Sequence, residues 1–150
     1  MNDLTTKYGD NLAVLGFPSN QFGHQTNEQD FEVLSTLKHV RPGEGYEPNF
    51  QMFSKLDING AGEDPIFTFL KSELPTVSDD CGGQGSDFIL SNNFLMIWSP
   101  MRRSDVIWNF EKFLINQEGK PVKRYSPKFE TADVAADIEK LIAEGPNALN

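Results

Sequence analysis

The sequence of 150 residues is poor in the residues from which disulfides and metal sites are built. Its single cysteine, Cys81, excludes a disulfide within the chain. His24 and His39 are the only two histidines, and their spacing gives no recognisable zinc-binding pattern. We therefore expect no metal site, and the lone cysteine favours a reducing compartment.

Long apolar stretches and an excess of basic residues are also lacking. The longest apolar runs, such as LAVLGF and FLMIW, are far too short to span a bilayer, and MNDLTTKYGD at the start lacks the regions of a signal peptide. The 13 Lys and Arg against 22 Asp and Glu give a formal net charge of −9. Because nucleic-acid binding needs a basic surface, we expect no nucleic-acid partner. The short apolar runs likewise predict no membrane span.

The apolar content, 38% of 150 residues, fits one domain spanning residues 1–150. Residues 2–8 have apolar side chains four apart and a glycine after them, which predicts the tail of a helix. Residues 12–17 are apolar without alternation and end before Pro18, which is typical of a short strand buried on both faces of a sheet. This order favours an α/β architecture.

Three further segments have helical periodicity: residues 27–39, 65–74 and 131–144. Thr26 and Gln29 resemble a capping box at the start of the first. Asp64 before Pro65 is an N-cap and first-turn pair for the second, and Thr131 is expected to cap the third.

Strand-forming residues occupy four segments: 50–58, 94–98, 105–115 and 121–125. The last two are separated by turn residues 117–120, which predicts a hairpin. Segment 78–87 has turn chemistry only, so we expect a surface loop there.

The segment GFPSNQFGHQ, residues 16–25, follows an apolar run and is rich in neutral amides. Side-chain amides can stabilise an anion without carrying charge, and they cannot act as nucleophiles. The segment is therefore typical of the supporting half of a reactive site, whose reactive atom comes from elsewhere.

Four motifs in order, GFPSNQFGHQ, RPGEGYEPNF, NGAG and WNFEKFL, resemble the glutathione peroxidases, in particular the animal selenocysteine-type, tetramer-forming branch. The likeness runs from Met1 to about Gly145. It implies a thioredoxin-like fold, with a central mixed sheet and helices on both faces, and the reduction of hydroperoxides by a thiol.

The resemblance also implies a nucleophile that this chain does not contain. In the family, a strand carrying selenocysteine or cysteine, followed by Gly and then Thr, precedes the first helix, and this chain starts inside that helix. A gene prediction that ignores selenocysteine recoding begins at the next methionine, which Met1 fits. We expect the nucleophile upstream of Met1, a fold without its N-terminal strands, no separate cofactor, and glutathione as co-substrate.

By motif match, Gln25, Trp108 and Asn109 take the positions of the family's catalytic glutamine, tryptophan and asparagine. All three offer N–H donors, and hydrogen bonds to a chalcogen anion lower its pKa. From the residues alone, Gln25 could equally be a turn amide, Trp108 a core aromatic and Asn109 a local turn residue. The adjacency of the last two within WNFEKFL favours a catalytic role.

Glutathione is anionic, so its site is expected to be basic. The resemblance points to Arg41 beside a Pro-Gly loop and to Lys123 and Arg124 in KRYS. The alternative for each is a solvated charge or a rim ion pair. Because guanidinium binds a carboxylate in bidentate fashion, we expect more from Arg41 and Arg124 than from Lys123.

The whole RPGEGYEPNF segment resembles the loop that packs between subunits of the tetrameric branch, which predicts a homotetramer for the complete protein. SPMRRSDVIWNFEKFL and KRYS are similar to the cytosolic type, which predicts a cytoplasmic location. Two alternatives stay open. The chain could be a catalytically dead binding or assembly partner, or Cys81 could serve as nucleophile, although Asp79 and Asp80 beside it should raise its pKa.

Overall fold

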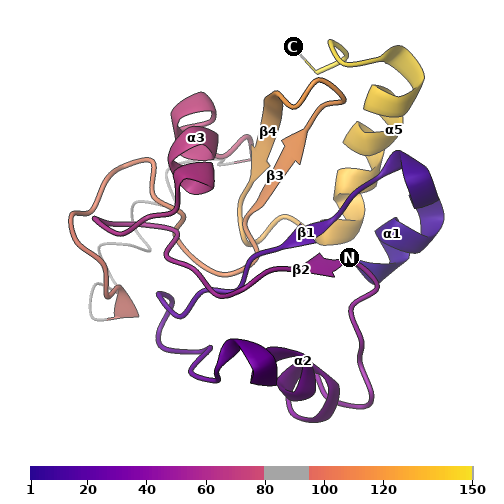
Figure 1. Cartoon of the computed structure of the whole chain (residues 1–150). Helices are drawn as coiled ribbons and strands as arrows, with labels where there is room; N and C mark the ends of the chain where they lie inside the picture. Colours follow the sequence, from indigo (N-terminus) through magenta and orange to yellow (C-terminus); the bar gives the residue numbers. More distant parts are fainter. Residues whose placement is uncertain (80–94, 150) are drawn as a thin grey trace. The chain divides into compact units, whose positions relative to one another are not determined.

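The structure is a computed structural model that describes residues 1–79 and 95–149 (Figure 1). The chain packs as two compact units, and each is described by itself. The N-terminal unit comprises Met1–Asn20 and His24–Leu56, and the C-terminal unit comprises Gln21–Gly23 and Asp57–Asn150. That the two form one domain stays a prediction.

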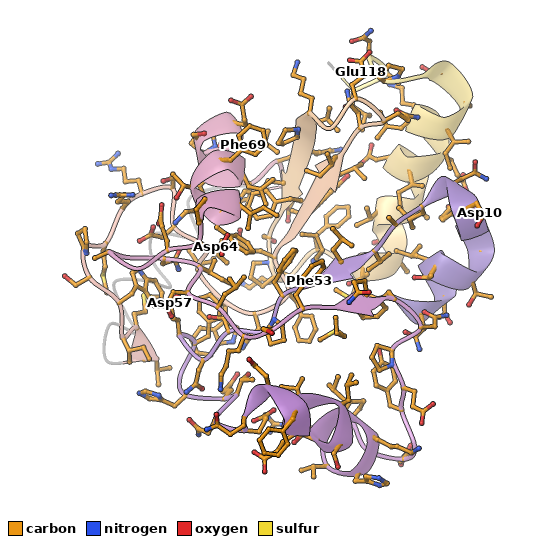
Figure 2. The ribbon with its side chains drawn as sticks, in the orientation of Figure 1. Asp10, Phe53, Asp57, Asp64, Phe69 and Glu118 are labelled. Atoms are coloured by element: carbon orange, nitrogen blue, oxygen red, sulfur yellow. The ribbon has the colours of Figure 1, made fainter. Side chains whose placement is uncertain are left out.

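The N-terminal unit contains helices α1 (Asn2–Tyr8), η1 (Gly9–Asn11) and α2 (Asp30–His39), and strands β1 (Leu15–Gly16) and β2 (Gln51–Met52). The two strands pair in parallel. A Cβ at Gly16 would lie 2.6 Å from the sulfur of Met52, so a larger residue here would require the flexible Met52 side chain to move. The Phe53 N–H extends the contact by donating to the Gly16 carbonyl at 2.9 Å, and Figure 2 labels Phe53 just beyond β2.

The sequence predicted the elements of the N-terminal unit better than their lengths. Helix α1 has the predicted bounds. The predicted strands 12–17 and 50–58 shorten to two residues each, and Leu15 is 50% exposed, so burial on both faces was wrong. Helix α2 begins at residue 30 rather than 27 because Gln29 and Glu32 form the capping box, whereas the Thr26 N–H donates to Asn20 Oδ1.

The C-terminal unit contains α3 (Pro65–Glu73), β3 (Lys112–Ile115), β4 (Pro121–Tyr125), η3 (Thr131–Val134) and α5 (Ala135–Glu144). Strands β3 and β4 form an antiparallel hairpin with Phe113 opposite Arg124. In Figure 1 this hairpin lies between α3 and α5. The Phe67 ring of α3 packs edge-on against Phe113 at 6.3 Å, and Lys123 of β4 binds Asp137 of α5 at 2.7 Å.

Local signals in the C-terminal unit located its elements well. Asp64 caps α3 by accepting from the Ile66 N–H at 2.9 Å, and Figure 2 shows it at the foot of that helix. The turn and strand β4 have the predicted bounds. Segment 105–115 is a strand only over its last four residues, and within described residues 95–98 only Met96 makes a bridge.

The C-terminal helix starts differently from the prediction. Thr131 is the first residue of η3 rather than a cap, and Glu130 precedes it without a side-chain cap bond. The α-helix itself begins at Ala135 and ends before Gly145, with Ile138 and Leu141 buried. The predicted loop 78–87 lies outside the described residues beyond Asp79.

Acid sensitivity is expected from Asp137, whose Oδ2 accepts from Lys123 Nζ and from the Tyr125 hydroxyl, both at 2.7 Å. Partial burial acts to raise the pKa of the Asp137 carboxyl, but these two donors outweigh it and hold that pKa below its usual value. Its contribution to stability is therefore present above the ordinary aspartate pKa, near 4, and is lost as pH falls through the lowered value. Urea unfolding at several pH values should show a smaller acid loss for Asp137→Asn; an unchanged loss contradicts the assignment.

In the part of the chain that the structure describes, no helix is both long and apolar enough to cross a membrane. Across the same residues, no group of three or more His, Cys, Asp or Glu side chains is arranged to hold a metal ion.

Candidate active site

Gln25 lies in the N-terminal unit, directly after a tight turn. Gly23 and His24 both have positive φ, at 64° and 52°, which reverses the chain before the glutamine. The Gln25 side chain is exposed. The turn is closed by Asn27, which donates to the His24 carbonyl at 2.7 Å. The turn thus places the Gln25 side chain at the surface of the N-terminal unit.

Two other amides of GFPSNQFGHQ have structural partners. Asn20 accepts from the Thr26 N–H and donates to Asn27 Oδ1, both at 2.9 Å. Gln21, in the C-terminal unit, accepts at 2.9 Å from the N–H groups of Ile58 and Asn59 and donates to the Asn59 carbonyl. The richness in amides therefore reflects loop construction as well as any catalytic role.

Trp108 and Asn109 lie in the C-terminal unit and are both half-buried. The Trp108 ring packs against Phe22 with ring centroids 5.8 Å apart. Phe110, with φ of 64°, follows them and is exposed. The structure thus places Trp108 and Asn109 on one irregular segment of the C-terminal unit. That these two residues meet Gln25, which belongs to the N-terminal unit, stays a prediction.

The three basic residues assigned to glutathione have different environments. Arg41 is exposed in the N-terminal unit, at the start of the RPGEGYEPNF loop. That loop is tied to α1, since Asn2 donates to the Glu47 carbonyl at 2.7 Å and accepts from the Asn49 N–H at 3.2 Å. Lys123 in the C-terminal unit has a 33% exposed side chain and is paired with Asp137.

Arg124 is 2% exposed, and its guanidinium is engaged inside the C-terminal unit. Its Nε donates to Glu111 Oε2 at 2.7 Å, and its Nη atoms donate to main-chain carbonyls, those of Leu74, Pro75, Ser104 and Asp105. A glutathione carboxylate could reach it only if these bonds broke. The structure argues against a direct glutathione contact by Arg124.

The buried polar cluster around Lys71 was not predicted from the sequence. Lys71 Nζ lies 2.6 Å from Glu63 Oε2, 3.2 Å from Asp105 Oδ1 and 3.1 Å from Asn59 Oδ1. The Trp98 indole donates to the other oxygen of Asp105 at 2.8 Å. The available signal was the position of Lys71 on the apolar stripe of α3, where a lysine must find acceptors.

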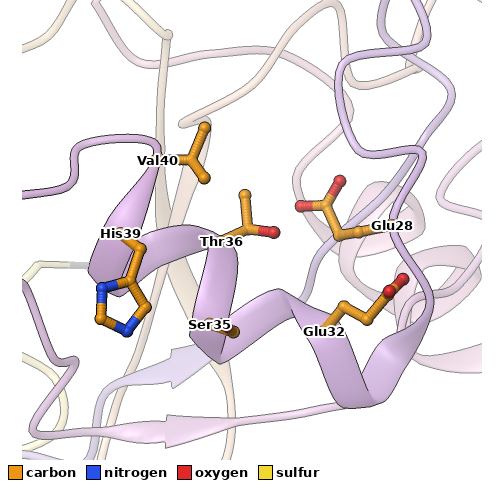
Figure 3. A pocket seen from close by; sticks show the side chains of 6 residues that line it. All are labelled: Glu28, Glu32, Ser35, Thr36, His39 and Val40. Carbon is orange, nitrogen blue, oxygen red and sulfur yellow. The ribbon is translucent and has the colours of Figure 1, made fainter.

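Two shallow pockets lie among the described residues of the separate units, and neither of these two includes a predicted site residue. One, of about 240 Å³, runs along α2 (Figure 3) and is lined by Glu28, Glu32, Ser35, Thr36, His39 and Val40. The other, of about 250 Å³, lies in the C-terminal unit, where Gln21, Asn59 and Trp98 contribute to its wall. The side chains of these three wall residues already donate hydrogen bonds within the protein.

Comparison with solved structures identifies the fold class. The crystal structure of Trgpx in apo form superposes with a TM-score of 0.59 at 24% identity, covering 95% of this chain and 65% of that one. The crystal structure of T. cruzi GPX1 gives the same TM-score at 23% identity, covering 95% and 68%. The chain thus has the α/β, thioredoxin-like fold of these proteins, as the sequence predicted, and spans just under two thirds of Trgpx.

Sequence comparison then identifies the family. The pattern of the family described as "Glutathione peroxidase" matches residues 1–71. The chain is 50% identical over 149 residues to glutathione peroxidase 1 of Macaca fuscata fuscata, covering 99% of this chain and 72% of that protein. It is 50% identical over 145 residues to the Mus musculus protein, covering 96% and 70%. The chain belongs to the glutathione peroxidase family.

Proposed function

We propose that the complete protein reduces hydrogen peroxide and organic hydroperoxides with glutathione. The observation that carries the proposal is the 50% identity to glutathione peroxidase 1 over nearly the whole chain. A chalcogen anion attacks the peroxide oxygen, the O–O bond breaks, and alcohol or water leaves. One glutathione then displaces water from the oxidised chalcogen, and a second releases glutathione disulfide and restores the anion.

The chain's own residues supply hydrogen-bond donors to this chemistry. In the proposal, the Gln25 amide, the Trp108 indole and the Asn109 amide donate to the chalcogen anion and to the departing oxygen. None of these groups titrates at physiological pH, so each can stabilise charge without competing for the proton. The nucleophile is the selenocysteine or cysteine predicted to precede Met1, and no separate cofactor takes part.

Arg41 and Lys123 remain the proposed contacts for glutathione, because their charged groups reach the surface. The proposal further includes a homotetramer and a cytoplasmic location. The first rests on the RPGEGYEPNF loop, whose exposed residues include Arg41, Glu44 and Glu47. The second rests on the likeness of KRYS and its neighbouring motifs to the cytosolic type. Analytical ultracentrifugation and fractionation of cells test these two points.

The function is tested by steady-state turnover of the full-length protein. With hydrogen peroxide and glutathione, we expect saturable consumption of peroxide, with two glutathiones oxidised for each peroxide reduced. Turnover that needs another thiol, such as a reduced thioredoxin, would reject glutathione as the reductant. No reduction of any hydroperoxide with either thiol would reject the proposed activity.

Replacing Cys81 with serine is expected to leave this turnover unchanged. The thiol stands next to Asp79 and Asp80 in the sequence, and neighbouring carboxylates disfavour the reactive thiolate. Steady-state rates of Cys81→Ser and parent protein, measured together, check this. Loss of turnover in the variant would make Cys81 the nucleophile.

A further inference from the structure

The segment 104–111, termed the Trp–Asn loop, carries Trp108 and Asn109 without helix or strand structure. Its main-chain polar groups therefore need partners outside a regular ladder. Three buried side chains of the C-terminal unit, Arg124, Asn59 and Glu111, provide them. The groups that they bind are the carbonyls of Ser104, Asp105 and Val106 and the N–H groups of Val106 and Ile107.

Arg124 and Glu111 act on the Trp–Asn loop as a pair. The guanidinium binds the carbonyls of Ser104 at 2.9 Å and Asp105 at 3.0 Å, and Glu111 Oε1 accepts from the Ile107 N–H at 2.7 Å. A 2.7 Å bond from Arg124 Nε to Glu111 Oε2 joins these two side chains to each other. Burial raises the pKa of Glu111, and the Arg124 charge acts in the opposite direction.

Asn59 holds the middle of the Trp–Asn loop. Its side chain accepts from the Val106 N–H at 3.0 Å and donates to the Val106 carbonyl at 2.8 Å, as a neighbouring strand would. Asn59 is itself fixed, because Gln21 binds both its N–H and its carbonyl at 2.9 Å. The NGAG and GFPSNQFGHQ motifs thus support the backbone that precedes Trp108.

A buried ion pair is a poor way to gain stability, because removing two charges from water costs about as much as their attraction returns. Its other effect is to fix geometry, and here the fixed groups lie one to four residues before Trp108. Donors to a developing charge work only when they are held in place before the reaction. The Trp–Asn loop is held in place by three side chains that are themselves buried, those of Arg124, Asn59 and Glu111.

We propose that Asn59, Glu111 and Arg124 are positioning residues that hold Trp108 and Asn109 as donors for the peroxide-reducing step. The proposal rests on the proposed function. It assigns Arg124 to the peroxide step, through the Trp–Asn loop, rather than to glutathione binding.

The kinetic test separates the two half-reactions in the full-length protein by rapid mixing. Arg124→Lys keeps the charge but cannot span two carbonyls and Glu111, and Glu111→Gln keeps the shape but removes one acceptor and the charge. Because small misplacements of reacting groups are costly, each should slow oxidation by peroxide about 10- to 100-fold. Reduction by glutathione should change by less than about threefold. Lys123→Met, on the same strand, should show the reverse pattern.

A second readout does not depend on activity. Hydrogen exchange at the Val106 and Ile107 amides reports directly on the loop, since exchange follows local opening. Both variants should exchange about tenfold or more faster at Ile107, while the amides of α5 keep the protection of the parent protein. Asn59→Asp loses the donor to the Val106 carbonyl, so its Val106 amide should likewise exchange about tenfold or more faster.

The outcomes distinguish the proposals. Unchanged exchange at both amides, or a slower glutathione step with an unchanged peroxide step, overturns the positioning role. If Arg124→Lys does not fold, Glu111→Gln decides by the same criteria. A parent protein that reduces no hydroperoxide overturns the proposed function, and the exchange data still decide whether these residues hold the loop.

Discussion

Replacing Lys71 with methionine is expected to lower the free energy of unfolding by about 3 kcal/mol, the lower end for breaking a buried ion pair. The Lys71 side chain is 3% exposed, and its ammonium lies within 3.2 Å of the Glu63 and Asp105 carboxylates. Methionine keeps the length and apolar contacts of the stem but leaves these carboxylates without their shared cation. Urea unfolding of variant and parent measures the difference.

Lys38→Met is the matched control, because Lys38 pairs with Glu47 where both side chains are exposed, at 43% and 68%. An exposed pair contributes little, so this variant should stay within about 0.5 kcal/mol of the parent. If the two variants lose the same free energy of unfolding, the prediction that the buried Lys71 pair contributes more than the exposed Lys38 pair is wrong.

Replacing Trp108 with phenylalanine is expected to slow the peroxide step about 100-fold, the effect of losing one donor to a developing anion. Phenylalanine keeps a ring to pack against Phe22 but has no N–H. Stability should therefore change little. Rapid mixing with hydrogen peroxide and thermal unfolding together check this, and a rate equal to that of the parent would remove the donor role.

Trp98→Phe provides the comparison, because this second indole is buried and donates to Asp105 Oδ2 at 2.8 Å. Its loss leaves a buried carboxylate oxygen short of a donor, so the free energy of unfolding should fall by about 1–3 kcal/mol. The two tryptophans thus differ in kind: one is expected to act on rate and the other on stability. A destabilisation by Trp108→Phe as large as that by Trp98→Phe contradicts this division.

Local chemistry made several elements predictable. Asp64 before Pro65 set the start of α3, and the turn residues 117–120 set the start of β4, because caps and turns depend on neighbouring residues only. The family motifs led to the correct family and fold class. Strand lengths were predicted less well, since pairing depends on a partner that lies elsewhere in the chain.

Burial of charge was the main feature that the sequence could not convey. Arg124 looks like a surface residue until long-range contacts bring Glu111 and main-chain carbonyls around it. The apolar stripe of α3 indicates burial of Lys71 but not its partners Glu63 and Asp105. Gln21 and Gln25 stand four residues apart in one motif, yet one is buried and the other exposed. Such differences depend on tertiary packing, which composition and periodicity do not encode.

Mass spectrometry of the full-length protein tests the central claim most directly. Protein treated with one equivalent of hydrogen peroxide, then with glutathione, should first gain one oxygen atom on a selenocysteine or cysteine outside residues 1–150. Glutathione should then replace that oxygen. Oxygen found on Cys81 and replaced there by glutathione, or no chalcogen oxidised at all, would contradict a peroxidase in which Gln25, Trp108 and Asn109 serve an anion supplied from outside this sequence.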